Sequence, residues 1–108
     1  AETITRMKPT ACLINTSRGG LVDEVALWEA IRNNRLAGAA LDVFDPEQCD
    51  LSRPLFQDER VLVTPHAAFV SAESLVELRL LVMGQVMAAL EGRRPDNVLN
   101  PQVYSPSA

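Results

Sequence analysis

Four polar residues have the types needed for acid–base chemistry on an anion: Arg18, Asp42, Glu47 and His66. Each stands at the end of a short apolar run or in the turn or loop that follows one. A cation, two carboxylates and an imidazole in one place could bind an anionic substrate and move a proton to or from it. Spacing along the chain leaves open whether these four side chains meet.

Each of the four residues also has an ordinary structural interpretation. A lone arginine in a turn, such as Arg18, is usually a solvated charge, and an acid that ends an apolar strand, such as Asp42, commonly faces water. Glu47 lies in an acidic loop, and His66 stands beside small residues where a structural histidine is as common as a functional one. A shared site therefore requires a fold that brings the four residues to one edge.

The apolar runs predict such a fold. Three of them have the length of strands and lack a helical period, and they cover residues 10–16, 38–44 and 61–64. Because a helical pattern separates the first two, the order indicates a parallel sheet with right-handed crossovers. Ligands bind outside the carboxyl ends of the strands of such sheets, which is where the four polar residues fall.

Two helices complete this pattern. Asp23 is the expected N-cap of a helix over residues 24–34, and Ser71 that of a long helix running to about Glu91. The long helix carries an apolar stripe and stops at a glycine, and the stripe consists of Val76, Leu80, Met83 and Met87. Almost uniformly apolar strands favour a sheet with helices on both faces. The prediction is an α/β fold, half of a doubly wound sheet.

Glycines and prolines mark the connections. Ser17–Gly20 forms a turn whose two glycines permit a positive φ and a close approach of backbone. Residues 45–60 are expected to form a long loop, and the tail from Arg93 to be extended. The opening residues 1–9 (AETITRMKP) read as the end of a helix, so we expect the chain to be part of a longer one.

Composition narrows the function classes. The 108 residues are 47% hydrophobic and 22% charged, with a net charge of −4 and no basic run, which argues against nucleic acid as a partner. The longest mostly apolar stretch, 75–90, contains charged residues and does not predict a membrane span. Cys12 and Cys49 read as reduced thiols of a cytoplasmic protein, and one histidine with no C-x-x-C argues against a metal site.

Three ordered motifs carry a resemblance to a known family. They are INTSRGGLVDEVAL (14–27), GAALDVFDPE (38–47) and VTPHAAF (63–69). Together they resemble the NAD-dependent D-2-hydroxyacid dehydrogenases, a family that includes D-3-phosphoglycerate dehydrogenases and the C-terminal binding protein corepressors. The resemblance implies the C-terminal half of a Rossmann-type doubly wound parallel sheet, with three strands, flanking helices and a long final helix. Residues 1–91 would belong to the NAD-binding domain, and 92–108 would return toward a substrate domain.

The resemblance also implies roles for individual residues. Arg18 would bind the substrate carboxylate, His66 would exchange a proton with the C2 oxygen, and Glu47 would hold the other imidazole nitrogen. The cofactor would contact Arg18 and His66 and also six further residues, namely Thr16, Ser17, Asp42, Ala67, Ala68 and Phe69.

The implied activity is hydride transfer between NAD(H) and a D-2-hydroxy acid or 2-keto acid. No G-x-G-x-x-G motif is present, so these residues do not decide between NAD and NADP. The expected parent is a cytoplasmic homodimer with a small-molecule substrate. An NAD-sensing, corepressor-like interaction protein is the alternative, because such proteins keep the same Arg, Glu and His.

Overall fold

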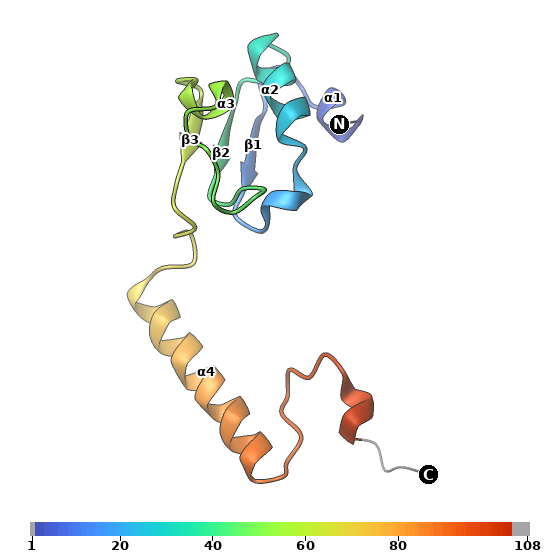
Figure 1. Ribbon diagram of the computed structural model, residues 1–108, viewed down its shortest axis with the longest axis vertical. Coiled ribbons are helices and arrows are strands. Elements are labelled where there is room, and N and C mark those ends of the chain that lie inside the picture. The colour runs from blue at the N-terminus through green and yellow to red at the C-terminus, as the bar shows by residue number, and fades with distance from the viewer. Residues whose placement is uncertain (1, 105–108) are drawn as a thin grey trace. The chain divides into compact units, whose positions relative to one another are not determined.

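The computed structural model describes residues 2–104, which divide between Ala68 and Phe69 into two compact units. Each unit is described by itself. The first unit holds the sheet and the residues expected to do chemistry, and the second holds the long helix (Figure 1). The last four residues of the expected tail, 105–108, lie outside the described residues.

The first unit is built on three parallel strands in the order β1-β2-β3 (Figure 1). They are β1 (Cys12–Asn15), β2 (Gly38–Leu41) and β3 (Val61–Val63). All three predicted strands are present and each is shorter than its apolar run. The parallel α/β architecture is confirmed.

Helix α2 (Glu24–Arg32) connects β1 to β2, as predicted. The Asp23 side chain caps it by accepting a hydrogen bond of 2.9 Å from the backbone N–H of Ala26. The apolar side of the helix packs on the sheet to form the core. The largest fully buried side chains of this core are Leu27, Ile31, Leu36, Leu41 and Leu55.

Two short helices flank this core. Helix α1 (Glu2–Thr5) contacts α2 and supports the interpretation of the opening residues as helical. Helix α3 (Pro54–Gln57) lies within the segment that was expected to be a long loop, so that prediction was wrong at these four residues. Pro54 suits the first turn of a helix, and Leu55 and Phe56 are buried in the core. Core packing therefore stabilises a helix too short to show a period in the sequence.

One face of the sheet differs from the expectation. Ile14, Ala40 and Leu62 are aligned across the three strands, and both large side chains of this row, Ile14 and Leu62, are exposed. Within the described residues of the first unit, no helix covers these two side chains. Apolar strands indicate a sheet that can be buried on both sides, and they do not show which chain segments bury it.

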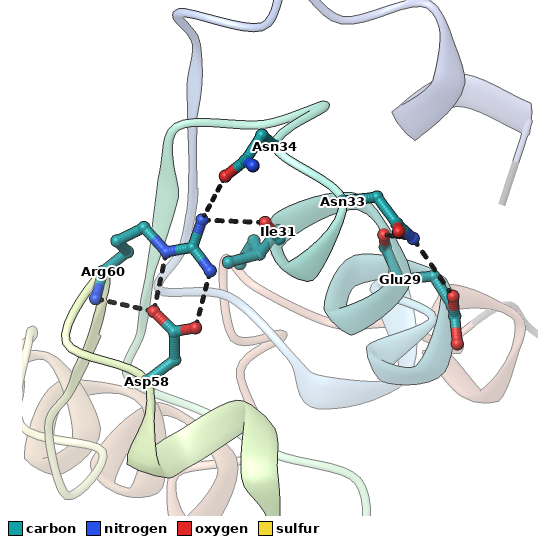
Figure 2. Close-up of polar contacts among 6 residues, drawn as sticks. All are labelled: Glu29, Ile31, Asn33, Asn34, Asp58 and Arg60. Carbon is teal, nitrogen blue, oxygen red and sulfur yellow. Dashed lines mark hydrogen bonds and ion pairs between the residues drawn. The ribbon is translucent and has the colours of Figure 1, made fainter.

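An arginine ties the amino-terminal edge of the sheet together (Figure 2). Arg60 Nη1 donates to the carbonyl of Ile31 in the last turn of α2 and to the Asn34 side chain, at 2.9 Å each. Its Nε and Nη2 donate to the two oxygens of Asp58 at 2.8 and 2.7 Å. The last carbonyls of a helix lack intrahelical partners, so this contact caps α2.

The second unit contains helix α4 (Ala72–Leu90) and the 3-10 helix η2 (Pro101–Tyr104). The Ser71 and Ser74 side chains each accept from the other's backbone N–H, which confirms the predicted N-cap. The helix ends before Gly92, which has a φ of 73°. All four residues of the predicted apolar stripe are exposed. No helix among residues 2–104 is long and apolar enough to cross a membrane.

Candidate active site at the carboxyl edge of the sheet

A buried carboxylate organises the segment that follows β3. Asp42 is 3% exposed and stands directly after β2. Its Oδ1 accepts from the Thr64 hydroxyl at 2.6 Å and from the Ala67 N–H at 2.8 Å, and its Oδ2 accepts from the Ala68 N–H at 2.9 Å. The bond from Thr64, followed by those from Ala68 and Ala67, lowers the pKa of Asp42 despite burial. Asp42 therefore stays ionised and holds the turn.

This turn places His66 in a backbone conformation that few residues adopt. His66 has a φ of 52°, and its backbone N–H donates to the Asp42 carbonyl at 2.8 Å. A positive φ at a non-glycine residue costs free energy, so it persists where the surroundings impose it. The bonds from Asp42 to residues on both sides of His66 supply that constraint.

Glu47 and His66 form the closest contact between two of the predicted catalytic residues. The Oε1 atom of Glu47 lies 2.6 Å from Nδ1 of His66. The side chains are 71% and 38% exposed, so the pair faces outward from the sheet edge. A carboxylate at Nδ1 fixes the ring orientation and directs Nε2 toward the groups with which the ring can exchange a proton.

The turn after β1 comes close to the end of β2. A Cβ on Gly19 would lie 2.0 Å from both the carbonyl carbon and the oxygen of Phe44, so only glycine fits there. Gly92 is the glycine with a positive φ among the described residues. The expected close approach is therefore confirmed at Gly19, and neither glycine of this turn uses the positive φ that glycine permits.

The Asn15 side chain holds this turn through two hydrogen bonds. Its side chain accepts from the Ser17 N–H at 3.1 Å and donates to the Arg18 carbonyl at 2.9 Å, and the residue is buried. Sequence reasoning had not assigned Asn15 this role, although asparagine at a strand end is a known signal for such a turn. The result is that Thr16, Ser17 and Arg18 are all exposed at the carboxyl end of β1.

The predicted site residues are brought together to different degrees. Asp42 and Glu47 converge on the segment that carries His66. The Arg18 guanidinium lies on its own turn, where Nη1 donates to the Ser17 carbonyl at 2.7 Å. Ala67 and Ala68 lie in the turn that Asp42 holds. Phe69 opens the second unit, so its place beside the cofactor stays a prediction.

A mostly apolar cavity of about 340 Å³ adjoins the Glu47–His66 pair. Its walls come from the end of β2, the loop that follows and the end of β3, and include Phe44, Cys49, Leu51 and Val63. Among residues 2–104, no cluster of three or more His, Cys, Asp or Glu side chains could hold a metal ion.

Comparisons with known proteins show which family the chain resembles. Residues 1–68 match the family model described as D-isomer specific 2-hydroxyacid dehydrogenase, NAD binding domain. A glyoxylate reductase from Korarchaeum cryptofilum is 41% identical over 102 residues, which are 94% of this chain and 31% of that protein. The chain therefore spans about a third of the length of this relative.

Two solved structures have the same fold. A D-isomer specific 2-hydroxyacid dehydrogenase from Lactobacillus delbrueckii, in an NAD complex, has a TM-score of 0.74 and 29% identity over 92% of this chain and 34% of its own. One from Xanthobacter autotrophicus, with NADPH and MES, has a TM-score of 0.77 and 31% identity over 96% of this chain and 42% of its own. The chain belongs to the D-isomer specific 2-hydroxyacid dehydrogenase family, and residues 1–68 match its NAD binding domain.

Proposed function

We propose that this chain supplies the proton-transfer part of an oxidoreductase that moves a hydride between NAD(H) and a D-2-hydroxy acid or 2-keto acid. The observation that carries the proposal is the 2.6 Å contact between Glu47 and Nδ1 of His66 at the carboxyl edge of a parallel sheet. Reduction of a ketone needs a proton donor, and oxidation of an alcohol needs a proton acceptor. An outward-facing imidazole held by a carboxylate can serve as either.

In this proposal His66 is the acid–base residue. During reduction, the protonated ring gives its Nε2 proton to the oxygen on C2 of the keto acid. During oxidation, the neutral ring takes the hydroxyl proton through the same nitrogen. Glu47 keeps the Nδ1 proton in place in both directions, so the ring presents Nε2 in one orientation.

Arg18 binds the carboxylate that every 2-hydroxy acid carries. Its side chain is exposed, and its Nη1 donates to the Ser17 carbonyl of its own turn, a contact that a substrate carboxylate can replace. The planar guanidinium offers two parallel donors, which fit a carboxylate better than a lysine would. The positive charge also stabilises negative charge that develops on the C2 oxygen.

The residues at this edge fit the nicotinamide end of a cofactor. Thr16 and Ser17 offer exposed hydroxyls, and Ala67 and Ala68 have side chains small enough for a ring to approach. A carboxylate can accept about four hydrogen bonds. Asp42 already accepts three, which leaves it able to receive one more donor, such as an amide. When bound, the nicotinamide supplies or accepts the hydride.

Several features of the whole protein belong to this proposal. We propose NAD as the cofactor, although similar structures hold NAD in one case and NADPH in the other. Four further predictions belong to this proposal. Residues 1–91 are part of the cofactor domain, and residues 92–108 return to a substrate domain. The whole protein is a homodimer and is located in the cytoplasm. The relative named above is a reductase, which favours the enzyme over the corepressor-like alternative.

Turnover by a protein of full family length tests the proposal. This chain would be joined to the remaining part of the Korarchaeum reductase, and NADH or NADPH oxidation would be followed with glyoxylate and hydroxypyruvate. We expect turnover that is lost when both Arg18 and His66 are replaced by alanine. A folded protein that binds cofactor and turns over neither acid would contradict the enzymatic function and favour the cofactor-sensing alternative.

A further inference from the structure

An ion pair between the buried Glu24 and the half-buried Arg53 anchors the loop that carries Glu47. The Glu24 side chain is 7% exposed and receives two hydrogen bonds from distant parts of the chain. Its Oε1 accepts from the backbone N–H of Asp45 at 3.1 Å, and its Oε2 accepts from Nη1 of Arg53 at 2.6 Å. Asp45 and Arg53 are the two ends of the loop 45–53, so one carboxylate holds both ends.

We infer that Glu24 is a positioning residue for the Glu47–His66 pair. A buried carboxylate costs free energy unless it is paired and hydrogen-bonded, and here both oxygens are used to close this loop. Glu24 is also the first residue of α2, where a negative charge is favourable. Through its two partners, Glu24 therefore connects both ends of the loop to the start of α2.

The Glu47–His66 pair cannot hold the loop by itself. Glu47 is 71% exposed, and ion pairs between exposed side chains contribute little because water screens them and side-chain entropy opposes them. The loop, moreover, has no regular hydrogen-bonded structure through which to place Glu47. Its position therefore depends on contacts made elsewhere in the loop, which are those at its two ends and the packing of Cys49 against the core.

Arg53, at the far end of the loop, also contacts the aromatic ring of Phe56. Arg53 lies 5.2 Å from the centre of the Phe56 ring, and Phe56 packs edge-on against Phe44 with ring centres 5.4 Å apart. Phe56 is part of the buried core, so Arg53 connects the loop to the core as well as to α2. A rigid loop end limits the positions that Glu47 can occupy.

The inference gives Glu24 a role in catalysis only if the proposed function is right, but its structural content can be tested without turnover. His66 is the single histidine of the chain, so nitrogen NMR of the imidazole reports on this ring alone. At about pH 8.5, some two units above the ordinary imidazole pKa, the spectrum shows which ring nitrogen carries the proton. In the 108-residue chain we expect the Nδ1–H form, because Glu47 accepts from Nδ1.

Replacing Glu24 with alanine should release the loop and lower the ratio of the Nδ1–H to the Nε2–H form by about 3- to 10-fold, the effect of losing one ordinary hydrogen bond. Glu24→Gln, which keeps an acceptor for the Asp45 N–H, should recover part of this ratio. Glu29→Ala is the matched control, because it removes an exposed ion pair with Arg32 from the same helix. We expect it to leave the ratio unchanged.

Backbone spectra show whether each variant is folded. A folded Glu24→Ala chain with the original tautomer ratio would overturn the inference, and so would an equal change in Glu29→Ala. If Glu24→Ala does not fold, Arg53→Ala decides by the same measurement, since Arg53 is 35% exposed and tolerates truncation better. If Glu24→Ala changes the tautomer ratio as expected but the full-length protein shows no turnover, the result counts against the proposed function and leaves the role of Glu24 in place.

Discussion

The two edges of the sheet use charged side chains in opposite ways. At the amino-terminal edge, the Arg60 guanidinium directs its bonds inward, to Asp58 and to the end of α2 (Figure 2). At the carboxyl edge, Asp42 and Glu24 also bond inward, but the Glu47–His66 pair that they support faces outward. A charged side chain such as Arg60, whose bonds are made within the protein, stabilises the structure. An exposed pair such as Glu47–His66, which other side chains hold in position, can take part in chemistry.

This contrast predicts that substitutions at the two edges separate into effects on activity and effects on stability. At the carboxyl edge, activity should fall while the fold remains. At the amino-terminal edge, stability should fall while the site is unaffected. The following predictions run from the largest expected effect to the smallest.

His66→Ala should lower kcat of the full-length protein by about 10²–10⁴-fold, the usual contribution of a positioned acid–base residue. Cofactor affinity should change little, because the hydride-carrying ring would be held by other residues. Steady-state kinetics and cofactor titration check the two expectations. A variant with nearly unchanged kcat would assign His66 to structure, in the same class as Arg60.

Arg18→Lys should reduce kcat/KM by roughly 30- to 1,000-fold, or about 2–4 kcal/mol of transition-state stabilisation, because lysine keeps the charge without the two-donor fork. The unfolding midpoint should be that of the original protein, since Arg18 is exposed and its bond is local. Kinetics with a 2-keto acid, together with a denaturant titration, measure both. Nearly full efficiency in the lysine variant would place Arg18 outside the site.

Asp58→Asn should lower the free energy of unfolding at neutral pH by about 1–2 kcal/mol. Hydrogen bonds from the Arg60 side chain and then its backbone lower the pKa of Asp58 to about 2. A group whose pKa is lower in the folded state stabilises above its unfolded value, near 3.9, and this contribution is lost as the pH falls.

The difference between the original chain and Asp58→Asn should therefore shrink between about pH 4 and pH 2. Urea unfolding of both chains across this range is the measurement. A difference that stays constant with pH would show that the carboxylate charge is not what stabilises this edge. Activity should be unaffected at neutral pH in the full-length protein.

Glu29→Ala should change the free energy of unfolding by no more than about 0.5 kcal/mol, because its ion pair with Arg32 is exposed and lies within one helix. Glu29→Ala is the reference for the other substitutions, because it removes the Glu29–Arg32 ion pair, which contacts neither the amino-terminal nor the carboxyl edge of the sheet. Urea unfolding checks it. A loss as large as that of Asp58→Asn would remove the distinction between inward-directed and solvated charge.

Patterns in the sequence were sufficient to predict much of the fold, whereas the meeting of Glu47 with His66 was expected only from the resemblance to a known family. The strands and α2 follow from apolar runs and a cap, which are local signals. Helix α3 was missed because its four residues owe their conformation to burial of Leu55 and Phe56 in the core. The exposed sheet face could not be predicted either, since an apolar side chain does not specify the segment that covers it.

The supporting contacts of the site were beyond sequence reasoning for a related reason. Glu24 and Arg53 are separated by 29 positions, and Asp42 and Thr64 by 22. Neither separation follows from a helical or strand period, so nothing local marks these residues as partners. Their pairing depends on how β2, its loop and α2 pack, which only the folded chain reveals.

The close approach at Gly19 bears on how this site could be redesigned. Since any side chain there would collide with the Phe44 backbone, a substitution would push apart the β1 turn and the loop that leads to Glu47. Libraries aimed at new substrates should therefore keep Gly19 unchanged. The close approach at Gly19 therefore fixes the distance between the turn that carries Arg18 and the loop that carries Glu47. A fixed distance favours substrates whose size fits between them.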